Sequence, residues 1–199
     1  MNIILGSKSP RRQELLKLLD LEFTCRTCDA DETYPDTLTG EQIPLHIART
    51  KSRAFGTLPN DTLLITADTI VWMNGVVYGK PDDEAEARQF LKQLSGKTHE
   101  VITGVYLRTA RSERSFAVCT QVRFASLTDD EINYYTSRYN PVDKAGAYGI
   151  QEWIGAVGVE HINGSYFNVM GLPVSRLWKE IKSIEADEAS AATSATPTT

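Results

Sequence analysis

The order of apolar and polar positions predicts a chain in which strands and helices alternate, organised around one hairpin. An apolar run over residues 63–67 ends at Asp68, and a second β-rich run over residues 70–73 follows directly. Asn74-Gly75 is a strong signal for a two-residue hairpin turn, and residues 76–78 form the returning strand. We therefore expect a hairpin whose longer strand carries a carboxylate between apolar residues.

The predicted hairpin brings a lysine close to this carboxylate. With the turn at Asn74-Gly75, residues whose numbers add up to about 149 face each other, which places Lys80 opposite Thr69 and beside Asp68. A carboxylate in a buried strand is costly unless it is paired, binds a metal or takes part in chemistry. A structural Asp68–Lys80 ion pair and a chemical role both remain open at this point.

Helical spacing and capping signals predict the other elements. An apolar strand is expected at residues 2–6, a short one over 157–162, and two long strand-like runs over 99–109 and 115–127. Helices are expected over residues 10–19, 44–55, 82–94 and 129–138, and after Pro173. Residues 143–151 have no clear period, and residues 163–168 are expected to form a loop. We expect one domain over residues 1–184 and a disordered Ala/Ser/Thr-rich tail over residues 185–199.

Composition limits the classes of function. Of the 199 residues, 41% are hydrophobic and 24% are charged, as in a soluble globular protein, and the net charge of −5 argues against binding a nucleic-acid polymer. No apolar run is long enough to cross a membrane, and the N-terminus does not resemble a signal peptide, so we expect a cytoplasmic protein. Cys25 and Cys28 have CxxC spacing, but no second ligand pair for zinc accompanies them, so they are interpreted as structural or incidental thiols.

The turn between the first strand and the first helix can hold an anion. Ser7, Ser9, Arg11 and Arg12 lie in this turn; Ser9 is a natural N-cap, and Pro10 suits the first helical position. Helix N-terminal amides and two arginines favour phosphate. We call residues 7–12 the anion cradle. The alternative is a solvated basic helix start.

Further charged residues could complete a site that hydrolyses phosphate esters. Asp68 and Glu32 could hold Mg²⁺ or Mn²⁺ together with substrate phosphates, or one of them could take a proton from water. Lys51 and Lys80 could bind the phosphates. The sequence does not show that Glu32 approaches Asp68, because Glu32 also fits as an ordinary carboxylate in an acidic loop.

An ordered set of motifs resembles the Maf family of nucleoside triphosphate pyrophosphatases. The resemblance covers about residues 3–182. The motifs, in chain order, are Ser7-Lys8-Ser9-Pro10-Arg11-Arg12, Ala67-Asp68-Thr69, Gly79-Lys80-Pro81, Ser95-Gly96-Lys97-Thr98-His99, the run from Asp143 to Gln151, and Gly171-Leu172-Pro173.

The resemblance implies a fold and a reaction. The fold is an α/β one, with a mixed twisted sheet flanked by helices and two lobes around a central cleft. The reaction is hydrolysis of a nucleoside triphosphate between its α and β phosphates, with a divalent cation required. Asp68 matches the family's proposed general base, with Lys80 and Glu32 as its catalytic companions. Substrate-binding residues would be Ser7, Ser9, Arg11, Arg12, Lys51, Thr69, Lys144 and Gln151. A homodimer is left open.

Gln151 carries the base preference in this interpretation. Arg12, Thr69 and Gln151 match positions associated with the branch that hydrolyses dTTP and UTP. A glutamine amide can meet the N3–H donor and the O4 acceptor of uracil and thymine together, whereas cytosine presents the opposite pattern. The alternative is a structural glutamine.

The chain departs from its relatives directly after Gln151. Many family members continue with Gly there, whereas Glu152 and Trp153 follow here, which leaves the detail of base recognition open. The alternative functions are a pyrophosphatase with another base preference, such as 7-methyl-GTP, and a nucleotide-binding regulator of cell division.

Overall fold

A single seven-stranded mixed sheet runs through the computed structural model, which describes residues 1–194, with side-chain burial described through residue 190. Its strand order is β2-β1-β3-β5-β6-β7, and β4 pairs with the second half of β3. The strands are β1 (Asn2–Leu5), β2 (Phe23–Cys25), β3 (Thr62–Met73), β4 (Val76–Tyr78), β5 (Thr98–Arg108), β6 (Glu113–Phe124) and β7 (Val159–Asn163). β1 is parallel to β2 and β3, and the other pairs are antiparallel.

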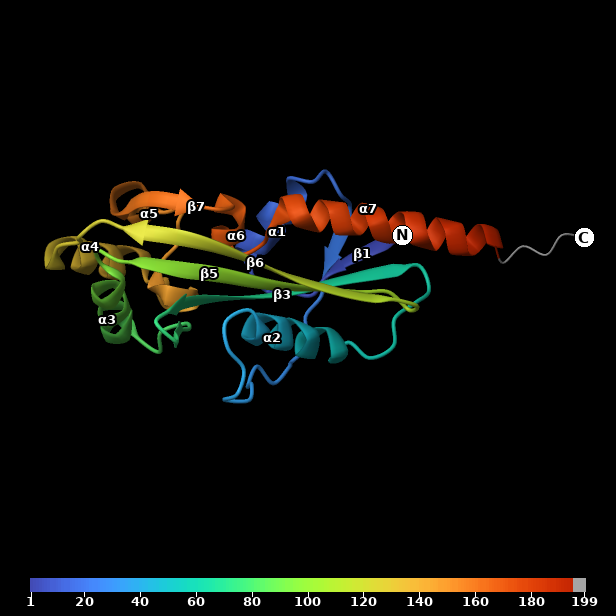
Figure 1. The fold of residues 1–199 in the computed structure, drawn as a ribbon, viewed down its shortest axis with the longest axis horizontal. Coiled ribbons are helices and arrows are strands. Elements are labelled where there is room, and N and C mark those ends of the chain that lie inside the picture. The colour runs from blue at the N-terminus through green and yellow to red at the C-terminus, as the bar shows by residue number, and fades with distance from the viewer. Residues whose placement is uncertain (195–199) are drawn as a thin grey trace, which may run out of the picture.

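Helices lie along the sheet and around one of its ends (Figure 1). The helices are α1 (Pro10–Lys17), α2 (Gln42–Arg53), α3 (Glu84–Leu94), α4 (Asp129–Tyr139), α5 (Trp153–Gly158), α6 (Tyr166–Met170) and α7 (Val174–Ser194), with 3-10 turns η1 (Pro141–Asp143) and η2 (Ala145–Ala147). α2 and α7 run along opposite sides of the sheet (Figure 1). α3 and α4 lie together at the end of the sheet that is away from the C-terminal end of α7 (Figure 1). Among the described residues, no helix is long and apolar enough to cross a membrane.

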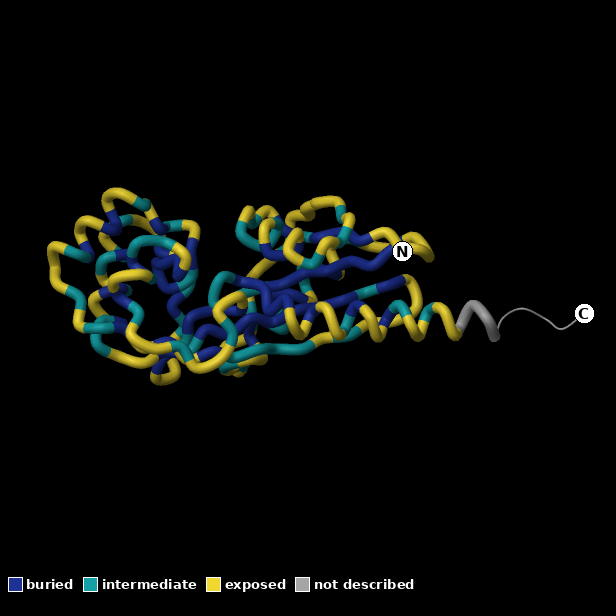
Figure 2. Tube along the Cα trace, turned by 90° about the horizontal axis from the view of Figure 1, so that it is seen from above, coloured by how far each residue is buried: buried dark blue, intermediate teal, exposed yellow. Residues whose placement is uncertain are grey.

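Polar residues in the middle of β3 divide the hydrophobic core into two parts. Leu63, Ile65 and Ala67 belong to a cluster completed by α1 and α7. Val71 and Met73, farther along the same face of the strand, belong to a second cluster completed by α3 and α4. Thr69 lies between the two clusters on this face. The elongated outline of the chain shows the two parts as separate lobes joined by the long strands (Figure 2).

The sequence-based prediction of a mixed α/β fold with flanking helices is confirmed, and so is the hairpin register. Val71 pairs with Tyr78 and Trp72 with Val77, as expected for a turn at Asn74-Gly75. Asn74 and Gly75 both have positive φ angles, of 53° and 82°, the backbone conformation that this turn requires.

Two local expectations differ from the structure. Residues 163–168 were expected to form a loop, but α6 begins at Tyr166. The short strand expected over residues 157–162 begins at Val159, because α5, for which no element was predicted, occupies Trp153–Gly158. α7 continues through the segment after residue 184 as far as Ser194, and residues 195–199 lie outside the described residues. The extension of α7 is held to the β5–β6 turn, because Glu188 accepts hydrogen bonds from Thr109 and Arg111, and Asp187 forms an ion pair with Arg114.

Candidate functional site

The main cleft opens where β3 lacks a strand partner along one edge. β1 pairs with β3 only as far as Leu5 and Ile65, and β4 begins to pair with it at Val71. Between these points β3 is bonded to β5 alone. At an open edge, side chains from both faces of a strand can reach the same space. This is why Asp68 and Thr69, which point to opposite faces, both line one cleft of about 430 Å³.

Every site residue predicted from the sequence lines this cleft. They come from the β1–α1 turn and the first turn of α1, the loop after β2, α2, β3, the segment after β4, and the segment between α4 and α5. They are Ser7, Ser9, Arg11, Arg12, Glu32, Lys51, Asp68, Thr69, Lys80, Lys144 and Gln151. The tertiary structure therefore gathers residues that are far apart in the sequence around one space of the size of a small-molecule site.

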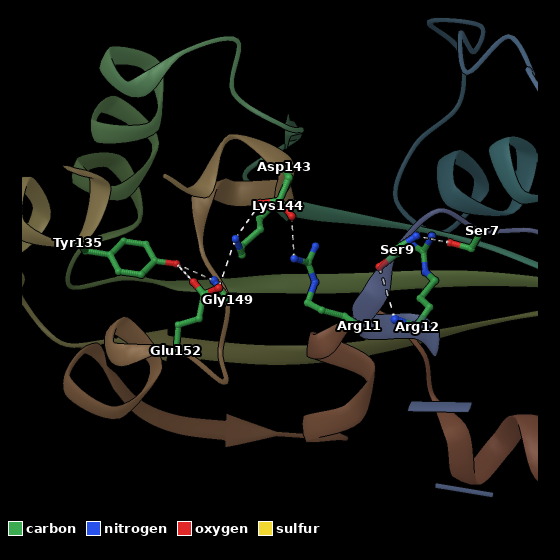
Figure 3. Close-up of polar contacts among 9 residues, drawn as sticks. All are labelled: Ser7, Ser9, Arg11, Arg12, Tyr135, Asp143, Lys144, Gly149 and Glu152. Carbon is green, nitrogen blue, oxygen red and sulfur yellow. Dashed lines mark hydrogen bonds and ion pairs between the residues drawn. The ribbon is translucent and has the colours of Figure 1, made fainter. Parts of the chain in front are cut away.

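The anion cradle has the geometry that its sequence predicts. Ser9 caps α1, and its hydroxyl oxygen accepts a hydrogen bond from the Arg12 backbone N–H at 3.4 Å. The Ser7 hydroxyl oxygen accepts one from the Ser9 N–H at 3.1 Å (Figure 3). Each hydroxyl therefore keeps its own proton, which it can donate to a bound anion at the N-terminus of the helix.

Arg12 is held in one orientation by the opposite side of the cleft. Its Nε donates to the Gly171 carbonyl at 2.9 Å, and its Nη2 donates to the Thr69 hydroxyl at 3.0 Å. Burial lowers the pKa of Arg12, and the nearby charge of Asp68 opposes this shift. Gly171 has φ of 116°, a conformation that favours glycine at this contact.

A chain of hydroxyls continues behind Thr69 into the protein. The Thr103 hydroxyl donates to the Asn168 carbonyl at 3.2 Å and lies 3.0 Å from the Thr69 hydroxyl. The Thr103 hydroxyl has a single proton and donates it to the backbone carbonyl of Asn168, so Thr69 must be the donor in the bond between the two threonines. The order of donation is therefore Arg12 to Thr69, Thr69 to Thr103, and Thr103 to the carbonyl. Thr103 is completely buried, so this chain supports Arg12 from below.

Two carboxylates share one lysine on the α2 side of the cleft. Lys51 Nζ lies 2.7 Å from Asp68 Oδ1 and 3.1 Å from Glu32 Oε2. We call these three residues the acid–lysine group. Glu32 does approach Asp68, which the sequence left open. Of the two alternatives left open for Asp68, the structural ion pair with Lys80 does not form among the described residues, because Lys51 takes that place and β4 ends at Tyr78 before reaching Lys80.

Close packing of α2 on the sheet positions Lys51. Gly104 faces Asp68 in the β3–β5 register, and a Cβ on Gly104 would lie 2.5 Å from the Leu45 backbone nitrogen at the start of α2. Only glycine permits this approach. Ala48 lies one turn before Lys51 in α2, and its carbonyl accepts a hydrogen bond from the buried Thr66 hydroxyl at 2.7 Å. This bond holds the helix against the strand that carries Asp68.

Lys80 and Arg12 differ from the other cations of the cleft. Lys80 is exposed, and among the described residues its ammonium has no ion-pair partner. Arg12 bonds a hydroxyl and a carbonyl rather than a carboxylate. Lys51, Arg11 and Lys144, in contrast, each contact at least one carboxylate. The charges of Lys80 and Arg12 are therefore the ones most available to an incoming anion.

The opposite wall is built by the segment between α4 and α5, shown in Figure 3. Lys144 Nζ lies 2.7 Å from Asp143 Oδ1 and 3.2 Å from Glu152 Oε1. Asp143 Oδ2 accepts a hydrogen bond from Arg11 across the cleft at 3.0 Å. Desolvation acts to raise the pKa of Asp143, but the bonds from Lys144 and Arg11 prevail and lower it.

Gln151 and Glu152, adjacent in sequence, occupy different environments. Gln151 is exposed and lines both the main cleft and a neighbouring hollow. Glu152 lines that hollow but not the main cleft, and turns inward toward Tyr135 and Lys144. A Cβ on Gly149 would lie 3.0 Å from Gln151 Nε2 and 2.8 Å from the Glu152 carboxyl carbon. Gly149 thus lets both side chains fold over the backbone.

Sequence reasoning missed four residues that shape the cleft. Asp143, Tyr148 and Gly171 line it, and Thr103 supports Thr69 from behind. Asp143 and Gly171 lay inside motifs, but no local pattern signalled their contacts with Arg11 and Arg12. A threonine in an apolar strand was the only signal for Thr103. The interpretation of the thiols as incidental stays untested: Cys25 and Cys28 are free and exposed, and Cys28 lines the cleft.

Comparisons with known proteins show which family the chain belongs to. The chain is 59% identical to a dTTP/UTP pyrophosphatase of Phocaeicola vulgatus over 184 residues, which covers 92% of this chain and 95% of that protein. It is 55% identical to a dTTP/UTP pyrophosphatase of Bacteroides fragilis with the same coverage of both chains. A model of the family described as Maf-like protein matches residues 2–184. This chain therefore belongs to the Maf-like protein family.

Proposed function

We infer that this protein is a nucleoside triphosphate pyrophosphatase that hydrolyses dTTP and UTP to the nucleoside monophosphate and pyrophosphate. The observation that carries this inference is the meeting of the acid–lysine group and the anion cradle in one cleft. Relatives that are named for this activity match the chain over nearly its whole length. Hydrolysis of a triphosphate requires cations for the phosphates and a base for water, and this cleft offers both.

The contacts that each cation already makes indicate whether it binds phosphate or holds carboxylates in place. The hydroxyls of Ser7 and Ser9, the N-terminus of α1, Arg12 and Lys80 are free to bind phosphate oxygens. Lys51 is already held between two carboxylates, so its first effect is to keep Asp68 and Glu32 close together despite their like charges. We therefore place the triphosphate between the anion cradle and Lys80, with Asp68 beside it.

We propose that Asp68 acts on water. One carboxylate oxygen accepts the Lys51 bond, and among the described residues Oδ2 accepts no hydrogen bond. In our proposal this oxygen takes the proton from the attacking water, and Lys51 orients the carboxylate. The runner-up is a protein of the same fold that binds nucleotides without hydrolysing them, which would need the cations but no base.

A divalent cation fits the two carboxylates, and we propose that Mg²⁺ or Mn²⁺ is held there. Among the described residues, no group of three or more His, Cys, Asp or Glu side chains could hold a metal alone. Mg²⁺ is commonly bound by one or two carboxylates, with water and substrate phosphates completing its shell. Asp68 and Glu32 supply such a pair. When bound, the cation would neutralise phosphate charge.

Base choice is assigned to Gln151, which lines the cleft near the segment that carries Lys144. The test is turnover of a panel of nucleotides, including dTTP, UTP, CTP, GTP and 7-methyl-GTP, with Mg²⁺ or Mn²⁺ and detection of pyrophosphate. We expect dTTP and UTP to be preferred. Gln151→Leu removes both amide hydrogen bonds to the base and should lower kcat/KM for both nucleotides, by about 1–3 kcal/mol of transition-state binding.

Three other results would count against parts of this proposal. Turnover at the uncatalysed rate on every nucleotide would favour a binding protein. A preference for 7-methyl-GTP would reject the pyrimidine assignment and leave the reaction standing. Equal loss on CTP and UTP in the Gln151→Leu variant would mean that Gln151 shapes the cleft without reading the base.

A further inference from the structure

A buried tyrosine joins the backbone of the cleft segment to a carboxylate. The Tyr135 hydroxyl accepts a hydrogen bond from the Gly149 N–H at 3.0 Å and bonds Glu152 Oε2 (Figure 3). Tyr135 is completely buried, and it comes from α4 rather than from the segment itself. The contact therefore ties a rigid helix to the part of the backbone that leads into Gln151.

The direction of each bond in this group is determined. Burial, followed by the bond to Glu152, raises the pKa of Tyr135, so its hydroxyl keeps its proton at neutral pH. The single proton goes to Glu152, and the lone pair of the oxygen accepts the Gly149 N–H. A phenylalanine at position 135 would keep the ring but remove both bonds.

A carboxylate is the side chain that suits position 152. Its Oε2 accepts from Tyr135, and its Oε1 lies 3.2 Å from Lys144 Nζ. Both neighbours are donors, so two acceptor oxygens are required. Glutamine offers only one acceptor oxygen, and would leave either Tyr135 or Lys144 without its partner. The Glu152 side chain is 20% exposed and that of Lys144 is 9% exposed, so water does not easily replace either contact.

The group continues across the cleft to the anion cradle. Lys144 also contacts Asp143, and Asp143 contacts Arg11 on α1. Two cations, Arg11 and Lys144, thus alternate with two carboxylates, Asp143 and Glu152, so that their charges balance. With its ammonium between two carboxylates, Lys144 acts here by holding the segment in place.

We propose that Tyr135 and Glu152 are positioning residues that set the base preference of the enzyme by fixing the Gly149–Gln151 backbone. The proposal rests on the function inferred above, in which Gln151 reads the pyrimidine. It gives a role to Glu152, the residue directly after Gln151. A positioned amide discriminates between uracil and cytosine, whereas a loosened one can turn to suit either base.

The test compares Tyr135→Phe with Tyr139→Phe. Tyr139 stacks on Tyr135 in the same helix, with ring centroids 5.0 Å apart, and among the described residues its hydroxyl has no hydrogen-bond partner. The measurement is kcat/KM for UTP and for CTP, with inhibition by inorganic triphosphate as a probe that has no base. In Tyr135→Phe, which loses both bonds of the hydroxyl, we expect the UTP-to-CTP ratio of kcat/KM to fall by about tenfold. Inhibition by triphosphate should stay within about twofold, and Tyr139→Phe should match the wild type.

A second pair of variants makes the test independent of Tyr135. Glu152→Gln should lower the UTP-to-CTP ratio of kcat/KM. The control is Glu160→Gln, which alters only a surface ion pair with Arg123 and should leave this ratio unchanged. An unchanged UTP-to-CTP ratio in Tyr135→Phe and Glu152→Gln would overturn the proposal. So would an equal loss on UTP, CTP and inorganic triphosphate. A wild-type enzyme without a preference for UTP would instead show that the underlying function is wrong.

Discussion

Replacing Thr103 by valine should impair catalysis through Arg12, which Thr103 does not touch. Valine puts a methyl group of similar size where threonine has its hydroxyl, so no cavity forms at this completely buried site. The change removes the acceptor of the Thr69 proton and one donor to the Asn168 carbonyl. That carbonyl keeps the bond from the Gly171 N–H at 2.9 Å, so it is not left without a partner. Thr69 is then free to rotate away from Arg12.

The cost in stability should be modest. Two neutral hydrogen bonds of about 0.5–1.5 kcal/mol each are lost, and the Thr69 hydroxyl can regain part of this from water in the cleft. We therefore expect a loss of about 1–2 kcal/mol, or a fall in Tm of roughly 2–8 °C for a chain of this length. Thr103→Ser is the matched control, because it keeps the hydroxyl but gives up a buried methyl group at a similar cost of about 1 kcal/mol.

The two variants should differ in activity although they are similar in stability. For Thr103→Val we expect kcat/KM for dTTP and UTP to fall by about tenfold, equivalent to about 1.4 kcal/mol of transition-state stabilisation. Thr103→Ser should stay within about twofold of the wild type. The assay is pyrophosphate release under subsaturating substrate, with Tm measured on the same preparations. Equal losses of activity in both variants, or wild-type kcat/KM in Thr103→Val, would refute the inference that Thr103 holds Arg12 in position through Thr69.

Three further predictions concern the acid–lysine group, the free cation and a buried histidine. Asp68→Asn should lower kcat by about a hundredfold or more with the fold retained, and near-normal kcat in a folded variant would remove Asp68 from the mechanism. Lys80→Ala should lower kcat/KM for triphosphates by about tenfold with Tm unchanged, since Lys80 has no ion-pair partner among the described residues. The control is Lys179→Ala, which changes another exposed lysine. A fall in Tm without a loss of kcat/KM in Lys80→Ala would assign Lys80 a structural role. Burial lowers the pKa of His99 to about 4, so its contribution to folding is present above the unfolded pKa of about 6.5 and is lost as pH falls from there toward 4. The free energy of unfolding, measured with denaturant, should therefore fall by up to about 1.4 kcal/mol per pH unit in this window. His99→Gln should make the free energy of unfolding depend less on pH. An equally steep pH dependence in that variant would mean that other groups cause it.

Local sequence was sufficient for the elements whose signals lie within a few residues. The hairpin at Asn74-Gly75 formed in the expected register because the turn requires positive φ angles that these residues adopt readily. Ser9 capped α1 as expected, because an N-cap is decided by the hydroxyl and the next three residues. The short helices α5 and α6, each of five or six residues, escaped prediction because one turn or two give no reliable period.

Motifs and charge patterns were also sufficient to name most of the charged and polar side chains of the cleft that the proposal uses, but not their partners. Asp68 was expected beside Lys80, and the structure pairs it with Lys51 from α2. That choice depends on Gly104, which lets α2 pack closely against the strand. Neither Gly104 nor Thr103 is close in sequence to the side chain it supports, so no local pattern could reveal its role.

The sequence by itself determined which chemistry is available: carboxylates, cations, a helix N-terminus and an amide, each placed at the end or in the middle of a recognisable element. The tertiary structure alone decided which carboxylate meets which lysine, that Arg12 is anchored by Thr69 and Gly171, and that Glu152 turns inward to Tyr135. The physical reason is the range of the interactions. Strand, turn and cap preferences act over a few residues, whereas ion pairs and hydrogen bonds in the cleft join residues brought together by packing of the whole sheet.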